Sequence, residues 1–162
     1  MIGVCIATYN QEKYIAQCIE SVLIQVCTWP IRIYIGNDCS TDRTASICQQ
    51  FANEHSHIVL INREHNLGLT ANTIQLLQQI REDGCEYIAM LDGDDYWLST
   101  DKLQQQIECL RAHPECGLVH TAYATSTGKQ VVRSAGISDM SKRYGLHGAS
   151  TCNCTVLFRA SL

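Results

Sequence analysis

The sequence predicts an α/β fold in which a mostly parallel sheet carries helices on both faces. Two observations support this prediction. Short apolar runs bounded by turn residues, which are typical of buried strands, recur along the chain. Between them lie segments of about 10 to 15 residues whose apolar positions repeat at helical spacing. Strands and helices that alternate in this way form βαβ units, and the strands of such units run parallel.

The chain begins with a strand, a helix and a second strand. Residues 2–8 (IGVCIAT) are apolar and are followed by turn residues, so we expect a buried strand. A helix is expected from Gln11 to Gln25, because the apolar residues of this segment repeat at helical spacing: Ile15, Cys18, Ile19, Val22 and Leu23. Residues 31–36 (IRIYIG) follow Pro30 and predict the second strand.

A second helix and a third strand–helix pair follow. In the segment NDCSTD, Ser40 or Thr41 can cap a helix that runs to about Asn53. Residues 57–62 (HIVLIN) predict the third strand, and a helix is expected from about residue 70 to residue 83.

The remaining elements end in a glycine-rich and serine-rich region. Residues 84–91 (GCEYIAML) predict the fourth strand, and Ser99 or Thr100 is expected to cap a helix over TDKLQQQIECLRAH. Residues 117–124 (GLVHTAYA) and 155–160 (TVLFRA) predict the last two strands, with residues 125–150 irregular between them.

The composition excludes some classes of protein. The formal net charge of −4 and the absence of a basic cluster argue against a nucleic-acid binder. No apolar run approaches the roughly 20 residues of a transmembrane segment, and the N-terminus lacks the basic region and cleavage site of a signal peptide. We therefore expect a cytoplasmic protein, or one that is peripheral at the inner membrane in its full-length form.

The chain contains ten cysteines, which are scattered through the predicted strands and helices and form no CxxC pair. The one close pair, Cys152 and Cys154, has no second half that would complete a zinc site. We expect the cysteines to act as small buried hydrophobic residues in a reducing compartment.

Polar residues follow each of the first four predicted strands. They are Thr8, Tyr9 and Asn10, then Asn37 and Asp38, then Asn66, and finally the acidic run from Asp92 to Asp95. Ligands of open parallel sheets bind at the carboxyl ends of the strands. These residues are therefore expected to line one crevice.

Three carboxylates, Asp92, Asp94 and Asp95, lie within four positions of MLDGDDYW. Like charges this close raise the pKa of at least one of them unless a positive charge balances them. Hard divalent cations such as Mg²⁺ or Mn²⁺ are held by one or two carboxylates together with substrate phosphates. Asp92 and Asp94, with only Gly93 between them, suit such a metal, which would in turn meet a diphosphate.

Other interpretations of the acidic run fit less well. An EF-hand loop that began at Asp92 would need Asp or Asn where the chain has Tyr96, and Gly where it has Trp97. A phosphatase nucleophile would be expected after the first strand, and a dinucleotide-binding site would need GxGxxG there. A solvated acidic turn without a ligand stays open as the simplest alternative.

Four segments resemble, in order and spacing, the family 2 glycosyltransferases with the GT-A (Rossmann-like) fold. They are VCIATYNQEKYIAQCIESVLIQ, IYIGNDCSTDRTASI, NLGLTANTI and EYIAMLDGDDYWLSTDKLQQQIECL, which together span about residues 2–123. The resemblance implies a metal-dependent, inverting transfer of a sugar from a nucleotide-diphosphate sugar, most often a UDP-sugar, to an acceptor hydroxyl. It also implies Mn²⁺ or Mg²⁺ as cofactor, a carbohydrate or lipid-linked acceptor, and commonly a role in polysaccharide biosynthesis.

The resemblance further implies roles for individual residues. Ala7 and Tyr9 would line the base pocket, and Asp38 would accept a hydrogen bond from the base. Asp92 would meet the ribose or the diphosphate, and Asp94 would be a direct metal ligand. The expected metal ligands are thus Asp92 and Asp94, and the expected substrate-binding residues are Ala7, Thr8, Tyr9, Asn10, Asp38, Asn66, Gly68, Asp92, Gly93 and Asp95. One departure is Asn37, which stands where the family has the first Asp of a DDxS-type run, and this leaves the nucleotide preference open.

No residue of the sequence is a convincing general base. In the family this carboxylate follows the strand that TVLFRA resembles, and the chain ends at Leu162 before such a motif. We therefore expect residues 1–162 to be one GT-A domain truncated on its C-terminal side, with the base beyond Leu162. A non-catalytic nucleotide-binding or scaffold module of the same fold stays open as an alternative. A nucleotidyltransferase is disfavoured, since no glycine-rich basic loop follows the first strand.

Overall fold

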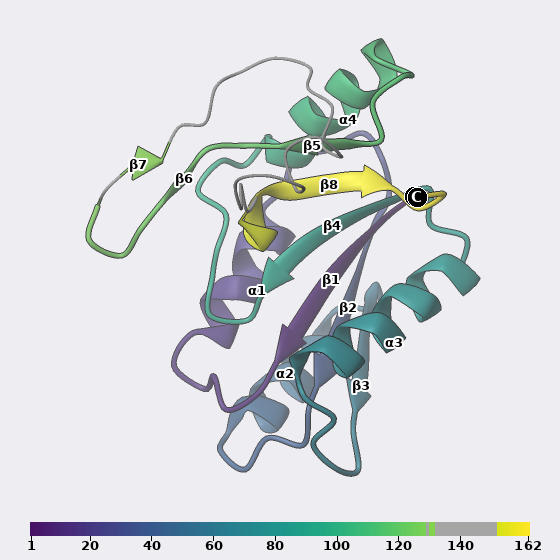
Figure 1. Cartoon of the computed structure of the whole chain (residues 1–162). Coiled ribbons are helices and arrows are strands. Elements are labelled where there is room, and N and C mark those ends of the chain that lie inside the picture. The colour runs from purple at the N-terminus through teal and green to yellow at the C-terminus, as the bar shows by residue number, and fades with distance from the viewer. Residues whose placement is uncertain (129, 132–151) are drawn as a thin grey trace, which may run out of the picture.

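Figure 1 shows the computed structural model of the protein, which describes residues 1–128, 130–131 and 152–162. Its main sheet has six strands in the order β3 (Ile58–Asn62), β2 (Ile31–Asn37), β1 (Ile2–Thr8), β4 (Tyr87–Asp92), β8 (Val156–Arg159) and β5 (Leu118–His120). β1 pairs in parallel with β2 and β4, and β2 with β3, whereas β8 is antiparallel to both of its neighbours. The expected mostly parallel α/β fold is therefore confirmed.

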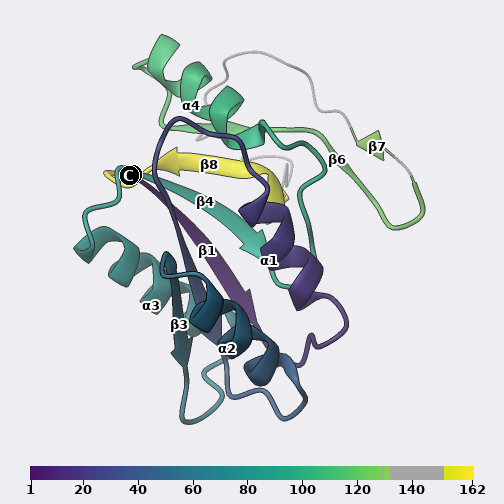
Figure 2. The same ribbon diagram turned by 180° about the vertical axis from the view of Figure 1, so that it is seen from behind.

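Helices cover both faces of the sheet (Figures 1 and 2). The side chains of Val4 and Ile6 in β1 pack into a core with α1 (Ile15–Leu23), α2 (Thr44–Glu54) and α4 (Lys102–Ala112). The alternate residues Cys5 and Ala7 point to the opposite face, where α3 (Leu69–Glu82) covers the sheet. This alternation is the period of two expected for a strand that is buried on both faces. None of the helices in the described residues combines the length and apolar character of a membrane span.

The register of the central strands brings their carboxyl ends to one level. Ala7 lies opposite Gly36 on one side and opposite Asp92 on the other, and Thr8 lies opposite Asn37. The loops after β1, β2 and β4 therefore leave the sheet at the same edge, which is the lower edge in Figure 1. This edge carries the polar residues that the sequence places after each strand.

The expected helix caps are wrong for α2 and α4. α2 begins at Thr44, and its first amide donates to Asp42 Oδ1 at 2.9 Å, while Ser40 and Thr41 bond to Asn10 instead. The local pattern did not predict this, because Asn10 of a different loop forms hydrogen bonds with both hydroxyl groups.

In α4 the expected hydroxyl caps are likewise replaced. The helix begins at Lys102, and the amide of Leu103 donates to Gln25 Oε1, 3.2 Å away, so a side chain from a distant segment satisfies this helix end. Ser99 donates to the Asp101 carboxylate and not to the helix. The helix expected over residues 11–25 is also shorter, since α1 spans Ile15–Leu23.

The strand expected over residues 117–124 is divided. β5 ends at His120, which lies opposite Val156, the first residue of β8, so the chain has no partner in the main sheet beyond that point. β6 (Tyr123–Ala124) pairs instead with β7 (Gln130–Val131) in a separate two-stranded sheet. The irregular segment expected over residues 125–150 therefore contains a strand, and residues 129 and 132–151 of it lie outside the described residues.

The packing of α3 gives a test of the fold. Leu76 is fully buried between α3 and the sheet, whereas Leu98 is 73% exposed. We expect Leu76→Ala to lower the free energy of unfolding by about 2–5 kcal/mol, because it removes apolar contacts and leaves a cavity. The matched variant Leu98→Ala is expected to stay within about 0.5 kcal/mol of the parent protein. Urea denaturation followed by circular dichroism would measure both, and equal losses would contradict the described packing of α3.

Candidate functional site

A cavity of about 450 Å³ opens at the carboxyl ends of β1, β2 and β4. Its lining residues come from four separate segments of the chain: Ala7, Thr8, Tyr9, Gln11, Asp38, Asn66, Gly68, Leu69, Asn72, Asp92 and Asp94. The parallel register described above brings these segments together, because it ends the central strands at one level. The crevice expected from the sequence is thus present.

The structure separates the predicted site residues into two groups. All of them line the cavity except Asn10, Gly93 and Asp95. The lining also includes Gln11, Leu69 and Asn72, which the sequence analysis missed. Asn72 is fully buried in α3, where a polar residue on the buried face of a helix was a signal that could have found it.

Asp38 holds the cavity wall through backbone amides. Its side chain is 3% exposed, and its two oxygens accept hydrogen bonds from the amides of Leu67 and Gly68, both at 2.8 Å. Its carboxylate also lies next to the start of α3, where a negative charge is favourable. Asp38 therefore fixes the turn that leads into α3 as well as lining the cavity.

Asn66 and Gly68 complete this turn. The Asn66 side chain donates to the carbonyl oxygen of Asp38 at 3.1 Å and accepts from the amide of Gly68 at 3.1 Å. Gly68 has φ = 81°, in the region that favours glycine. The pair thus has a structural role that does not depend on any ligand.

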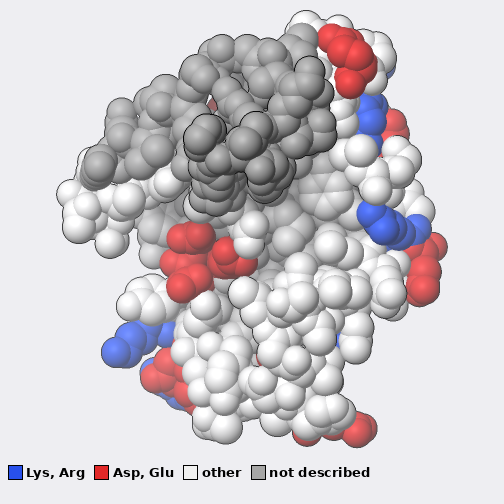
Figure 3. All heavy atoms as spheres, in the orientation of Figure 1, with Lys and Arg blue, Asp and Glu red and all other residues white. Residues whose placement is uncertain are grey.

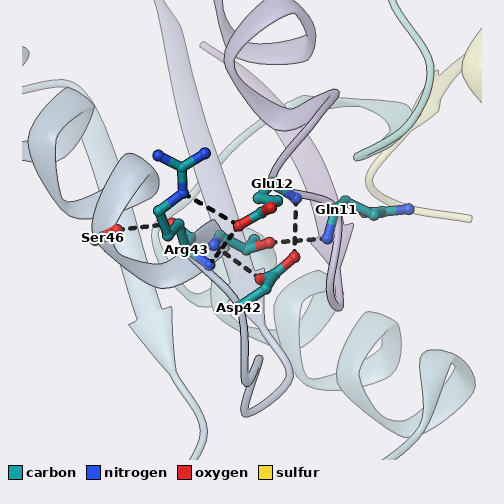
Figure 4. A network of polar contacts seen from close by, with 6 residues as sticks. Gln11, Glu12, Asp42, Arg43 and Ser46 are labelled. Atoms are coloured by element: carbon teal, nitrogen blue, oxygen red, sulfur yellow. Dashed lines mark hydrogen bonds and ion pairs between the residues drawn. The ribbon is translucent and has the colours of Figure 1, made fainter.

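The loop after β1 is tied to the start of α2 by a network of polar contacts (Figure 4). The amide of Gln11 donates to Thr44 Oγ1 at 2.8 Å, and the amide of Glu12 donates to Asp42 Oδ2 at 3.1 Å. In return, Glu12 Oε2 accepts from the amide of Arg43 at 3.0 Å and forms an ion pair with its guanidinium. These contacts hold Tyr9 and Gln11 at the mouth of the cavity.

Asn10 belongs to the same network and not to the cavity lining. It has φ = 53°, a left-handed conformation that Asn tolerates better than most residues. Its side-chain oxygen accepts from the amide of Thr41 at 2.8 Å, and its own amide donates to Ser40 Oγ at 3.0 Å. In this structure Asn10 therefore joins the loops after β1 and β2, and the substrate contact expected for it stays a prediction.

The acidic run forms a tight turn at the end of β4. Gly93 is buried, and a Cβ atom there would collide with the Gln11 amide oxygen and lie 2.8 Å from Thr8 Oγ1. A side chain at this position would require Gln11 and Thr8 to shift. With glycine there, Asp92 and Asp94 lie on the cavity lining. Asp95 faces away from the cavity, toward Cys152 and Cys154.

The negative charge of this turn is not balanced by a neighbouring cation. Among the described residues, no Lys or Arg forms an ion pair with these three aspartates, and Figure 3 shows a group of acidic side chains on this face. Burial and the nearby carboxylates of Asp95 and Asp94 raise the pKa of Asp92, against a hydrogen bond with the Asn153 side chain. The sequence predicted that the repulsion among the three carboxylates raises the pKa of at least one of them, and the pKa of Asp92 is raised by burial and by this repulsion.

The donor set fits a hard divalent cation. Asp92 and Asp94 offer carboxylate oxygens on a cavity wall, and such oxygens are the ligands that Mg²⁺ and Mn²⁺ prefer. A bound cation would also remove the repulsion that raises the pKa of Asp92.

Two further polar atoms are buried beside the cavity without a partner in the described part of the chain. They are Asn37 Oδ1 and Arg63 Nη2. Asn37 Nδ2 donates to Asn62 Oδ1 at 2.9 Å, and Arg63 Nε donates to Asn72 Oδ1 at 3.1 Å. Arg63 thus lies behind the cavity wall that Asn72 forms, half-buried.

An open, mostly parallel sheet whose central strands end at one cavity defines an α/β protein of the doubly wound type, a class in which ligands bind at this edge of the sheet. The family within this class follows from sequence comparison. A profile of the family described as Glycosyl transferase family 2 matches residues 3–161, and the chain belongs to this family.

Related proteins agree with this assignment. A dTDP-rhamnosyl transferase of Shigella flexneri is 34% identical over 106 residues, which are 64% of this chain and 36% of that protein. The chain covers only 31% to 36% of the length of this relative and of three uncharacterised mycobacterial relatives.

Solved structures share the fold. S. aureus TarS in complex with UDP has a TM-score of 0.72 at 20% identity, over 99% of this chain and 47% of that chain. A mannosyltransferase from Pyrobaculum calidifontis, in complex with GDP-Man and Mn²⁺, has a TM-score of 0.65 at 22% identity, over 76% of this chain and 35% of that chain. At this identity the likeness concerns the fold alone, and it confirms the GT-A fold expected from the sequence.

The role of Asp38 in the turn can be tested without a ligand. In Asp38→Asn one of the two acceptor oxygens becomes an NH₂ group, which would face a backbone N–H. We expect the free energy of unfolding to fall by about 1–3 kcal/mol, because a buried donor loses its partner. The control is Glu20→Gln, which removes an exposed acid on α1 and should change stability by less than about 0.5 kcal/mol. Urea denaturation would measure both variants, and equal effects would contradict this role.

The raised pKa of Asp92 predicts a pH dependence. Between the ordinary carboxyl pKa of about 4 and its raised folded value, the folded state binds more protons than the unfolded state, so stability falls as the pH rises. Without divalent cations, we expect Asp92→Asn to raise the free energy of unfolding at pH 7 and to have no such effect below about pH 4. Urea denaturation across this pH range would test it, with Glu20→Gln on the exposed side of α1 as control. A gain that stayed constant with pH would show that the charge of Asp92 is not its cause.

Proposed function

We propose that this chain forms the donor-binding part of an inverting glycosyltransferase that uses a UDP-sugar and Mn²⁺ or Mg²⁺. The observation that carries the proposal is the pair of aspartates, Asp92 and Asp94, on the wall of a cavity at the carboxyl edge of the sheet. The transfer would go to a hydroxyl group of a carbohydrate or lipid-linked acceptor.

The base and the ribose would occupy the side of the cavity formed by β1, β2 and the start of α3. Tyr9 exposes 46% of its surface at the cavity mouth, which leaves its ring free to pack against a planar base. Ala7 is small and buried, so the base could approach the strand closely there. Asp38 accepts two backbone amides and still has lone pairs that could accept a base N–H.

The diphosphate would lie toward Asp92 and Asp94. A cation held between these carboxylates and the phosphate oxygens would stabilise the negative charge of the departing diphosphate. The aspartates alone would repel that group, since their own charge is unbalanced among the described residues. Metal and nucleotide are therefore expected to bind together, each supplying the charge that the other needs.

The relatives support a nucleotide donor without fixing the base. The similar proteins include a dTDP-rhamnosyl transferase, TarS in complex with UDP, and a mannosyltransferase in complex with GDP-Man and Mn²⁺. The preference for UDP in this chain is part of the proposal, because Asn37 has replaced one acid of the family pattern. Among the described residues, Asn37 Oδ1 is also one of two buried side-chain polar atoms without a hydrogen-bond partner.

A general base is not assigned to the described residues. Three acids follow the acidic run within them, and all three are exposed and lie off the cavity: Asp101, Glu108 and Glu115. Asp139 lies outside the described residues. We propose that the base of an inverting transfer is contributed by another segment of the whole protein, so that donor binding is the activity to test on residues 1–162.

Calorimetric titration of the protein with UDP, with and without Mn²⁺, tests the proposal. We expect heat of UDP binding in the presence of Mn²⁺, and a loss of affinity of about tenfold or more in Asp94→Ala. Glu20→Gln removes an acid on the exposed side of α1 and should leave the affinity unchanged.

The same titration separates the proposal from a scaffold module of the same fold. A scaffold would fold normally, as judged by circular dichroism, and would bind neither Mn²⁺ nor UDP at the cavity. The proposed function would be overturned if the parent protein gave no heat of UDP binding in the presence of Mn²⁺. It would also be overturned if Asp94→Ala bound UDP with the same heat as the parent protein.

A further inference from the structure

A second cluster of metal-ligating side chains lies on the other side of the acidic turn, away from the cavity. It consists of Asp95, Cys152 and Cys154, whose ligand atoms all lie within 4.8 Å of one another. The two Sγ atoms are 3.1 Å apart, and all three residues are half-buried. None of the three lines the cavity.

The fold brings these residues together from two segments that are far apart in the sequence. Asp95 follows β4, and its amide donates to the carbonyl oxygen of Asp92 at 2.9 Å. Cys152 and Cys154 flank the first residue of the short helix η1 (Asn153–Thr155), which leads directly into β8. Because β8 is antiparallel to β4, its beginning lies beside the end of β4, as Figure 1 shows.

The backbone that carries the two cysteines is held by several hydrogen bonds. The carbonyl oxygen of Cys152 accepts from the amide of Thr155 at 3.0 Å and from its hydroxyl group at 2.6 Å. The carbonyl oxygen of Cys154 accepts from Trp97 Nε1 at 2.8 Å, and Gln106 Nε2 donates to the carbonyl oxygen of Thr155 at 2.8 Å. These hydrogen bonds fix the backbone that carries the two thiols. The thiols are therefore held close together, as the ligands of a metal ion must be.

We propose that Asp95, Cys152 and Cys154 form a second metal site, which binds a thiophilic divalent cation of the Zn²⁺ type through one carboxylate oxygen and two thiolates. Three protein ligands leave one position of a tetrahedral ion open for water. Binding displaces one proton from each thiol, so the affinity is expected to rise with pH.

The observed geometry needs only a small adjustment to hold such an ion. Two sulfurs at about 2.3 Å from a tetrahedral Zn²⁺ lie about 3.8 Å apart. The two Sγ atoms would therefore separate by less than about 1 Å from their 3.1 Å contact, within the range of a side-chain rotation.

A buried lysine, Lys102, lies near Cys154 and forms no ion pair with Asp95. The Lys102 side chain is 7% exposed, and its ammonium group lies 4.2 Å from the centre of the Trp97 ring and donates to Gln106 Oε1 at 2.7 Å. Burial lowers the pKa of Lys102 to about 7, and the charge of Cys154 opposes that shift. A divalent ion with two thiolates and one carboxylate carries a net charge of −1, which a protonated Lys102 would balance.

The two proposed sites differ in the cations that they select. Asp92 and Asp94 offer oxygen ligands only, whereas the second site offers two sulfurs, and soft thiolate ligands select Zn²⁺ over Mg²⁺ or Mn²⁺. The Asn153 side chain, between the two cysteines, bonds to Asp92. A cation at the second site would therefore stabilise the segment from Cys152 to Cys154, which contacts Asp92, a proposed ligand of the first site.

Titration of the reduced protein with Co²⁺ alone, followed by absorption spectroscopy, tests the second site. Thiolate ligands give tetrahedral Co²⁺ a near-ultraviolet charge-transfer band, which oxygen ligands do not produce. We expect this band to reach its full intensity at one Co²⁺ per chain. Zn²⁺ should displace Co²⁺ and remove the band, whereas excess Mn²⁺ should leave the band unchanged. The band should vanish in Cys152→Ser/Cys154→Ser, and Asp95→Asn should weaken Co²⁺ binding by about tenfold or more.

The control is Cys109→Ser, which removes an exposed thiol on α4 and should leave the band unchanged. No charge-transfer band in the parent protein, or a band that persists in the double variant, would overturn the proposal. If the double variant fails to fold by circular dichroism, Asp95→Asn decides, because an unchanged affinity there would also overturn it. UDP plays no part in this readout, so its outcome is independent of the proposed function.

Discussion

The parallel register of β1, β2 and β4 is the constraint on which the rest of the structure depends. It sets Ala7 opposite both Gly36 and Asp92, so three loops leave the sheet at one level. β1 is buried on both faces, so a slip of one residue would exchange the side chains that pack against α3 with those that pack against α1 and α2. The register brings these loops to one place, and the contacts within and between the loops then shape the cavity.

Hydrogen bonds between backbone amides and short polar side chains hold the loops around the cavity. Asp38 accepts the amides of Leu67 and Gly68, and Asn10 accepts the amide of Thr41, so each loop is held by a side chain from a neighbouring one. Such cross-links leave little freedom in the loops. A site arranged in this way is formed before any ligand arrives, which reduces the cost of ordering it on binding.

The acidic turn after β4 is the opposite case, since its contacts leave charge unbalanced. Burial and two neighbouring carboxylates raise the pKa of Asp92. The turn has two sides: Asp92 and Asp94 face the cavity, and Asp95 faces two thiols. Each side offers a cation a different set of ligand atoms, oxygen on one and mainly sulfur on the other, so one short segment joins the two proposed sites.

The sequence by itself determined the order of strands and helices, the mostly parallel sheet and the edge at which the polar residues gather. Apolar periodicity reports burial directly, and parallel strands place their carboxyl ends together, so these features follow from local pattern. Only the tertiary structure decided that Asn10 joins two loops, that Asn72 reaches the cavity, and that Asp95 meets Cys152 and Cys154. These contacts join residues far apart in the chain, and no local pattern can report a partner that the fold brings from elsewhere.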